Sequence, residues 1–155
     1  MEVEGPVVVK RAYDVYLRSC GIYRMDAVLQ TVMNKALQQA IREGAMMYED
    51  EMSRGGLVYS VVRMDGTARV RLRKRGPRAF EEIPPSEINA VSLHLAERDH
   101  YDIGSEEHMR AVHEWFDLKR LTTQTRQILV DIINKKFPYV LEYLLGVEVG
   151  TLLKC

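Results

Sequence analysis

Cysteine is scarce in this 155-residue sequence: there are two, Cys20 and Cys155, and the second is the last residue. Such a pair makes a poor disulfide framework, so we expect a reducing compartment and a cytoplasmic location. No apolar run approaches the roughly 18 residues needed to cross a bilayer, and no signal-peptide pattern opens the chain. These absences predict a protein without a membrane partner.

Net charge is absent as well, because 22 Lys and Arg residues balance 22 Asp and Glu residues. A neutral total argues against indiscriminate binding to phosphates. The charges are nevertheless unevenly placed. Residues 63–78 hold seven basic residues against one acidic residue, and residues 79–117 hold ten acidic residues against two basic ones. The sequence therefore predicts a polar molecule with a basic middle.

Patterns typical of catalysis are also missing. There is no Gly-rich phosphate loop followed by Lys, no nucleophile elbow and no cysteine with an obvious partner base. All four histidines lie between His94 and His113, but His108 and His113 are separated by roughly 140° around a helix and cannot chelate one ion. We expect no enzyme, no cofactor and no metal. A metal-dependent enzyme that uses the histidines with Asp99 and Asp102 is the weakest alternative.

Hydrophobic periodicity predicts mostly helices. Helices are expected over residues 7–20, 26–43, 85–97, 105–116 and 122–136. The period changes to two over residues 45–49, 57–63 and 68–73, which indicates strands joined by Gly-containing turns. The tail, residues 137–155, is apolar and interrupted by glycines, and we interpret it as a strand pair.

An internal repeat relates the two ends of the chain. A shift of 96 residues places the first helix pair over the last one without a gap, with similar residue types and one shared arginine. The matched positions are Tyr13, Tyr16, Cys20, Ile22, Arg24, Met25, Val32, Met33 and Ala36 on Met109, Val112, Phe116, Leu118, Arg120, Leu121, Ile128, Leu129 and Ile132.

A short helix, a tight turn, a longer helix and a β-hairpin follow one another in winged-helix domains, and the first half shows this order. The expected fold class is therefore α+β, mostly α, built from two tandem winged-helix-like halves. We place the halves at residues 1–76 and 77–155, with a small antiparallel hairpin or sheet, the wing, between them. One compact unit is the alternative.

Several short motifs resemble a bacterial domain of unknown function. They are Glu4-Gly5-Pro6-Val7, Gly21-Ile22-Tyr23-Arg24, Arg75-Gly76-Pro77-Arg78, Glu82-Ile83-Pro84-Pro85-Ser86-Glu87-Ile88 and Phe116-Asp117-Leu118-Lys119-Arg120. That domain is found near the C-terminal ends of large helicase- and endonuclease-related proteins, and the resemblance covers residues 3–136. It implies a tandem winged-helix-like accessory module beside a nucleic-acid motor. The sequence departs from the domain after the last helix, where the usual glycine is missing.

The clearest candidate site is the third predicted strand, where three apolar residues alternate with arginines. Alternation on a strand would put these arginines on one face. Guanidinium groups stay charged and bind phosphate with two hydrogen bonds, so we expect a phosphate clamp on the wing. The clamp comprises Arg69, Arg71, Arg73, Lys74, Arg75 and Arg78. The alternative is a solvated strand that protects a sheet edge or pairs with the acidic second half.

A second candidate is the start of the last predicted helix. Thr123, Gln124, Arg126 and Gln127 can donate hydrogen bonds to base edges or phosphates, as a recognition helix does. The alternative is an ordinary polar helix face capped by Thr122. The equivalent residues of the first half, Asn34, Lys35, Gln38 and Arg42, are the weaker candidate.

Together these features predict a nucleic-acid-binding accessory module, with DNA as the favoured ligand. The competing hypothesis is a protein-interaction module or homodimer without nucleic-acid binding, because winged helices also serve as docking surfaces. Its candidate contact face is the apolar tail, namely Tyr139, Val140, Leu141, Leu144 and Leu145.

Overall fold

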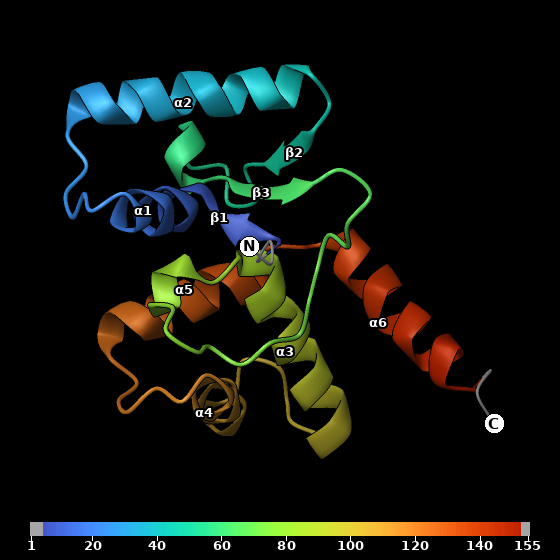
Figure 1. Ribbon diagram of the computed structural model, residues 1–155. Helices are drawn as coiled ribbons and strands as arrows, with labels where there is room; N and C mark the ends of the chain where they lie inside the picture. Colours follow the sequence, from blue (N-terminus) through green and yellow to red (C-terminus); the bar gives the residue numbers. More distant parts are fainter. Residues whose placement is uncertain (1–4, 153–155) are drawn as a thin grey trace. The chain divides into compact units, whose positions relative to one another are not determined.

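The computed structural model describes residues 5–152, and the side chains of residues 5–146. The fold is mostly helical and contains one small three-stranded antiparallel sheet (Figure 1). The chain divides into two compact units, with the boundary between Arg69 and Val70 rather than after Gly76. We call them the first unit and the second unit. No helix among the described residues is long and apolar enough to cross a membrane.

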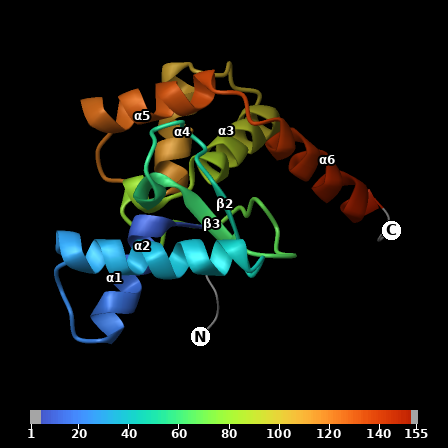
Figure 2. The same ribbon diagram turned by 90° about the horizontal axis from the view of Figure 1, so that it is seen from above.

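The first unit contains a helix pair and the sheet. Its elements are β1 (Val7–Val8), α1 (Val9–Ser19), α2 (Ala27–Arg42), β2 (Met46–Glu49), the short 3-10 helix η1 (Leu57–Tyr59) and β3 (Val61–Met64). The sheet has the order β1-β3-β2, and β3 pairs antiparallel with both neighbours. Helix α2 lies over β2 and β3, as the two views in Figures 1 and 2 show.

Local sequence explains where these helices begin and end. The Asp26 carboxylate accepts a hydrogen bond from the Leu29 backbone N–H at 2.8 Å and so caps α2. Gly44, with φ of 75°, follows the end of α2 in a left-handed conformation that glycine adopts without strain. The core of the first unit consists of Val9, Tyr13, Leu37 and Val62, with partly buried apolar residues around them.

The apolar periodicity of residues 26–43 predicts a core stripe that is only partly correct, namely Leu29, Val32, Met33, Ala36, Ala40 and Ile41. Met33 and Ile41 pack against the core as expected, but the buried residue between them is Leu37. Val32 and Ala36, which the periodicity assigned to the core, are exposed. Tyr13 of α1 donates a hydrogen bond to Asn34 at 2.9 Å, and Asn34 is partly buried, so its predicted place on the outward face is wrong.

The second unit is helical. It contains the 3-10 helix η2 (Phe80–Glu82), α3 (Pro85–Asp99), α4 (Glu106–Trp115), α5 (Thr123–Asn134) and α6 (Pro138–Leu152). Helix α3 packs against α4, α5 and α6. Its buried side chains include Ile88, Val91 and Leu95, and Val112 of α4 and Ile132 of α5 are buried in the same unit.

The predicted strand over residues 68–73 is wrong. Residues 65–79 form turns and irregular structure, and the hairpin joins β2 to β3 through residues 50–60. The carbonyl groups that a strand would offer to a neighbour accept side-chain hydrogen bonds instead. Arg73 O accepts from Trp115 Nε1 at 3.2 Å, Lys74 O from Arg78 Nη2 at 2.8 Å, and Arg75 O from Arg78 Nε at 3.0 Å.

The predicted strand pair in the tail is also wrong, because residues 138–152 form α6. Pro138 occupies the first helical position, where its fixed φ favours a helix and its missing N–H costs nothing. Phe137 and Val140 are buried and anchor the start of this helix. Gly146 and Gly150 suggested turns but lie inside the helix, and residues 153–155 lie outside the described part.

The internal repeat is visible in the backbone. Helices α2 and α5 begin 96 residues apart, at Ala27 and Thr123, and each has a side-chain cap at the preceding residue. Gly21 and Asp117, also 96 apart, both have positive φ, at 77° and 50°. The turns make equivalent hydrogen bonds, from Ile22 N to Leu17 O at 2.8 Å and from Leu118 N to His113 O at 3.2 Å. The two helix pairs therefore share one turn geometry.

Candidate nucleic-acid interface

The predicted arginine clamp is not a single surface. Arg69 ends the first unit and forms an ion pair with Glu49 of β2. Arg71 is exposed and makes no interaction among the described residues. Because residues 68–73 are not a strand, their alternation does not gather the arginines on one face.

Arg73 instead belongs to a buried ion-pair cluster of the second unit. Glu87, in the first turn of α3, is fully buried. Its Oε2 accepts from Arg73 Nη2 at 2.6 Å and from Arg78 Nη1 at 3.0 Å, and its Oε1 accepts from Arg78 Nη2 at 2.8 Å. A buried carboxylate needs such compensation, so these arginines hold the segment before α3 in place. The pairing of Arg73 with Glu87 agrees with the alternative interpretation, in which the arginines pair with the acidic second half. The burial of Glu87 could not be predicted, because acidic residues are common in a first helical turn.

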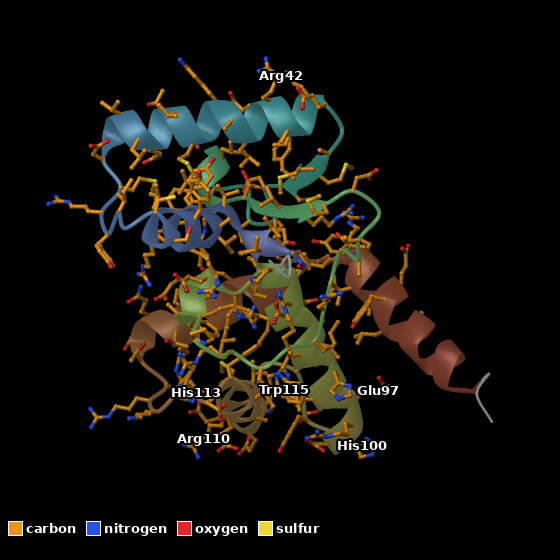
Figure 3. The ribbon with its side chains drawn as sticks, in the orientation of Figure 1. Arg42, Glu97, His100, Arg110, His113 and Trp115 are labelled. Atoms are coloured by element: carbon orange, nitrogen blue, oxygen red, sulfur yellow. The ribbon has the colours of Figure 1, made fainter. Side chains whose placement is uncertain are left out.

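Lys74 and Arg75 are also engaged within the second unit. The Lys74 ammonium group lies 4.0 Å from the centre of the Trp115 ring. Arg75 donates to Phe116 O at 2.8 Å and to Arg78 O at 3.0 Å. Figure 3 labels Trp115, which comes from α4. Both side chains therefore tie residues 73–78 to the end of α4, a use that the sequence pattern did not indicate.

Residues predicted for a recognition helix lie at the start of α5. Thr123 and Gln124 are exposed, and Gln127 donates to Asp131 Oδ1 at 2.8 Å along the same helix. Arg126 binds both carboxylate oxygens of Glu106 on α4, at 2.6 and 2.8 Å. This hydrogen bonding lowers the pKa of Glu106 and raises that of Arg126, so the pair stays ionised at neutral pH. Arg126 is thus committed to a carboxylate.

Helix α2, the equivalent of α5 in the first unit, has a polar surface whose side chains make fewer interactions within the chain. Thr31, Lys35, Gln38 and Arg42 are exposed and recur at three- and four-residue steps, so they share one flank of α2. We call these four residues the polar flank. Lys35 makes no interaction among the described residues, and Arg42 donates only to Gln39 of its own helix, at 3.1 Å. Figure 3 shows Arg42 on the side of α2 away from the strands.

A loop beside the polar flank presents a further cation. The Asp50 carboxylate accepts hydrogen bonds from the backbone N–H groups of Arg54 and Gly55, at 3.0 and 2.9 Å. These bonds order the turn and leave the Arg54 side chain exposed. A groove of about 520 Å³ separates α2 from this loop, with Gln38, Arg42 and Gly56 among its lining residues. A Gly-containing turn is predicted between residues 49 and 57 and lies in this loop. The strand wrongly predicted over residues 68–73 concealed that the loop lies beside α2.

The histidines do not form a metal centre. His108 is fully buried, with Nε2 2.9 Å from Ser92 O and Nδ1 accepting from Gly104 N–H at 3.0 Å. His113 is buried as well, and its Nε2 has no hydrogen-bond partner in the described chain. The repeat places His113 over Leu17, an apolar core position. Among the side chains that the structure describes, residues 5–146, no three from His, Cys, Asp or Glu are grouped to hold a metal ion.

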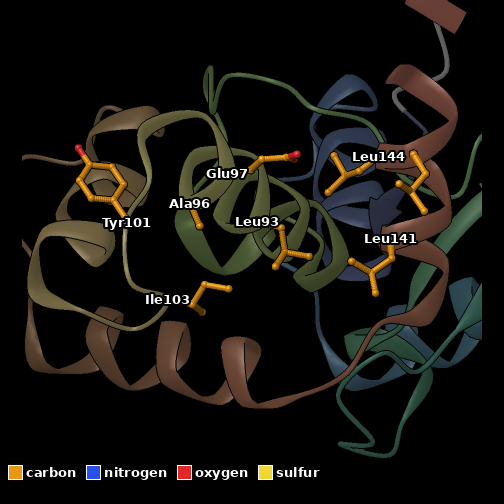
Figure 4. A pocket seen from close by; sticks show the side chains of 8 residues that line it. Leu93, Ala96, Glu97, Tyr101, Ile103, Leu141 and Leu144 are labelled. Atoms are coloured by element: carbon orange, nitrogen blue, oxygen red, sulfur yellow. The ribbon is translucent and has the colours of Figure 1, made fainter. Parts of the chain in front are cut away.

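A second groove, of about 350 Å³, lies between α3 and α6 and is mainly apolar (Figure 4). Leu93 and Ala96 line it from α3, Tyr101 and Ile103 from the following loop, and Leu141 from α6. Of the tail residues predicted for a contact face, Val140 is buried, while Leu141 and Leu145 are more than half exposed beside this groove.

Comparison with known proteins gives no match: no protein-family model, no curated protein and no solved structure is similar to this chain.

Proposed function

We propose that this protein is a non-enzymatic nucleic-acid-binding module of the winged-helix type, and that its contact surface is the polar flank of α2 together with Arg54. The association with helicase or nuclease machinery is part of the proposal and rests only on the sequence resemblance. DNA duplex is the expected ligand.

The arrangement of the first unit supports the winged-helix interpretation. A strand, a helix, a seven-residue turn, a longer helix and two strands follow one another, and the first strand pairs with the last in the order β1-β3-β2. In winged-helix domains the second helix of the pair enters the major groove and the loop between the last two strands contacts the backbone. Here those elements are α2 and residues 50–60.

The observation that carries the proposal is the chemistry of the polar flank. Gln38 and Thr31 can hydrogen-bond to base edges, while Lys35 and Arg42 can neutralise phosphates. None of them is committed to a carboxylate, in contrast to Arg69, Arg73 and Arg126. Arg54 would add a phosphate contact from the loop.

The test is a fluorescence-anisotropy titration with duplex and single-stranded DNA at two salt concentrations. Binding of duplex DNA should weaken with salt. Replacing Lys35 and Arg42 with alanine should weaken binding further and lower the slope of log K against log salt by about two, one for each lost phosphate contact.

A matched control removes two exposed arginines elsewhere, Arg98 and Arg110, and so makes the same change in net charge. This variant should bind as the native chain does. Equal losses in the two variants would show that only net charge matters. Absent or salt-insensitive binding by a folded chain would refute the nucleic-acid proposal.

The second candidate function is homodimerisation through α6, favoured by the exposure of Leu141 and Leu145 beside the apolar groove. Sedimentation over a range of chain concentrations should then show a dimer that Leu141→Glu dissociates. A monomer at all concentrations would exclude this candidate.

A further inference from the structure

The two helix pairs share a turn geometry but differ in how one of their faces is covered. In the second unit, α3 packs across both α4 and α5. Ser92 of α3 contacts His108 of α4, and the ring of His94 meets that of Trp115 with 6.1 Å between centroids. Val112 and Ile132, on the same side of the pair, are buried.

The equivalent face of the first unit is open and apolar. The 96-residue shift relates Ala111, Val112, Ile128 and Ile132 to Val15, Tyr16, Val32 and Ala36. Val15 is 47% exposed, Tyr16 53% and Val32 56%, and Ala36 is exposed too. We call these four residues the open face. No helix precedes β1 in the described part of the first unit as α3 precedes α4 in the second.

On α2, the open face differs from the other exposed apolar residue in the state of the equivalent position of the second unit. Val28 is exposed as well, but its equivalent in the second unit, Gln124, is also exposed. The open face therefore combines apolar side chains with positions that the same fold buries under a helix elsewhere in this chain. Exposed apolar residues that are grouped in this way indicate a contact surface.

We propose that the open face docks an amphipathic helix of a protein partner, in the way that α3 packs on α4 and α5. The partner helix would carry a stripe of aliphatic side chains at the spacing of Ile88, Val91 and Leu95. Such a helix buries apolar surface on both partners, which provides the driving force for the contact.

Charge complementarity defines one end of that partner helix. Arg18 lies one turn after Val15 on α1 and Arg24 lies in the turn before α2; both are exposed and have no partner within the described chain. In the second unit the acidic first turn of α3 lies near the equivalent turn, because Arg78 bonds to Glu87 and Arg75 bonds to Arg78 O and Phe116 O. The partner helix should therefore begin with acidic residues, which also suits its helix dipole.

The inference is independent of the proposed nucleic-acid contact. On α2, Val32 and Ala36 are centred roughly 110° around the helix axis from the polar flank. A helix docked on the open face leaves Gln38 and Arg42 accessible. Failure of DNA binding would not affect the docking proposal, and the reverse also holds.

Cys20 provides a native reporter for the test. It is a free, exposed thiol whose equivalent, Phe116, is fully buried in the second unit. In a Cys155→Ser chain, Cys20 becomes the only thiol, and its rate of alkylation by iodoacetamide measures access to the open face. The probe is a stapled helical peptide with the sequence of residues 80–99, which contains α3 and its acidic start.

At a peptide concentration ten times its Kd, alkylation of Cys20 should be about tenfold slower. Val32→Glu should abolish this protection. Val28→Glu, the same change on the same helix but outside the open face, should retain it. Both positions are exposed, so both variants should fold, and circular dichroism checks this.

Three outcomes would overturn the proposal. One is an unchanged alkylation rate at every peptide concentration. The second is equal loss of protection in the Val28 and Val32 variants. The third is protection that rises with the concentration of the chain alone, because a second copy would then occupy the open face instead of a partner helix.

Discussion

The first and second units use the same helix pair in two different environments. In the first unit the pair packs against a three-stranded sheet through Val9, Tyr13 and Leu37. In the second unit α3 packs against both helices of the pair, and Val112, Phe116 and Ile132 are buried. The turn between the helices is unchanged, with positive φ at Gly21 and Asp117.

The difference shows that the turn and its caps set the local geometry, while the packing partner decides which helix face is buried. Tyr13 in the first unit and its equivalent in the second, Met109, are both buried. Cys20 in the first unit is exposed, whereas its equivalent, Phe116, is buried. The second unit encloses a carboxylate with two arginines, and the first unit pairs Glu49 with Arg69 at its surface.

The largest expected effect comes from truncating the equivalent positions 116 and 20. Phe116→Ala should lower the free energy of unfolding of the second unit by about 3–5 kcal/mol, because it leaves a cavity in the core. Cys20→Ala should change the first unit by less than about 0.5 kcal/mol. Denaturant titration monitored by Trp115, the single tryptophan, reports on the second unit. Similar costs at both positions would contradict the comparison.

The next largest expected effect on the free energy of unfolding comes from removing the charge of Glu87, compared with that of Glu49. Glu87→Gln removes the charge that compensates buried Arg78 and should cost about 3 kcal/mol. Glu49→Gln breaks an ion pair between partly exposed side chains and should cost less than about 1 kcal/mol. The same tryptophan-monitored titration, with tyrosine fluorescence added for the first unit, measures both. A small effect of Glu87→Gln would mean that the cluster does not hold the segment before α3.

The smallest effect is a pH dependence of the second unit that comes from Glu106. The hydrogen bond from Arg126 lowers the pKa of Glu106 below its ordinary value of 4.5, so folding favours the carboxylate. The pair therefore contributes stability above the unfolded-state pKa and loses it as pH falls through the lowered pKa. Arg126→Gln should return the pKa of Glu106 toward 4.5, measured by NMR titration of the side-chain carboxyl. An unchanged pKa would show that another group sets it.

Much of the helical framework could be predicted from the sequence. The caps at Asp26, Ser105 and Thr122 and the apolar periodicity located α2, α4 and α5 to within a few residues. The 96-residue shift also related the correct pairs of helices. These signals are local, so they can be recognised in the sequence without knowing which elements pack together.

The errors arose where tertiary contacts override a local pattern. Alternating arginines predicted a strand over residues 68–73, but Glu87 and Trp115, which lie far along the sequence, bind its side chains and carbonyl groups. Glycines in the tail predicted turns, although Phe137 and Val140 anchor a helix. The charge density of residues 69–75 therefore predicted a clamp, although Arg69 and Arg73 form ion pairs within the chain. The polar flank of α2 has a lower charge density and gives a weaker signal in the sequence.

The difference between the covered and open faces can be measured directly at two equivalent positions. In a Cys20→Ser, Cys155→Ser background, Ala36→Cys and Ile132→Cys each introduce one thiol on the same face of the two helix pairs. We expect the thiol at position 36 to be alkylated nearly as fast as a peptide thiol, and the thiol at position 132 about 100-fold more slowly, because α3 must open first. Similar rates at the two positions would contradict a covered second unit and an open first unit.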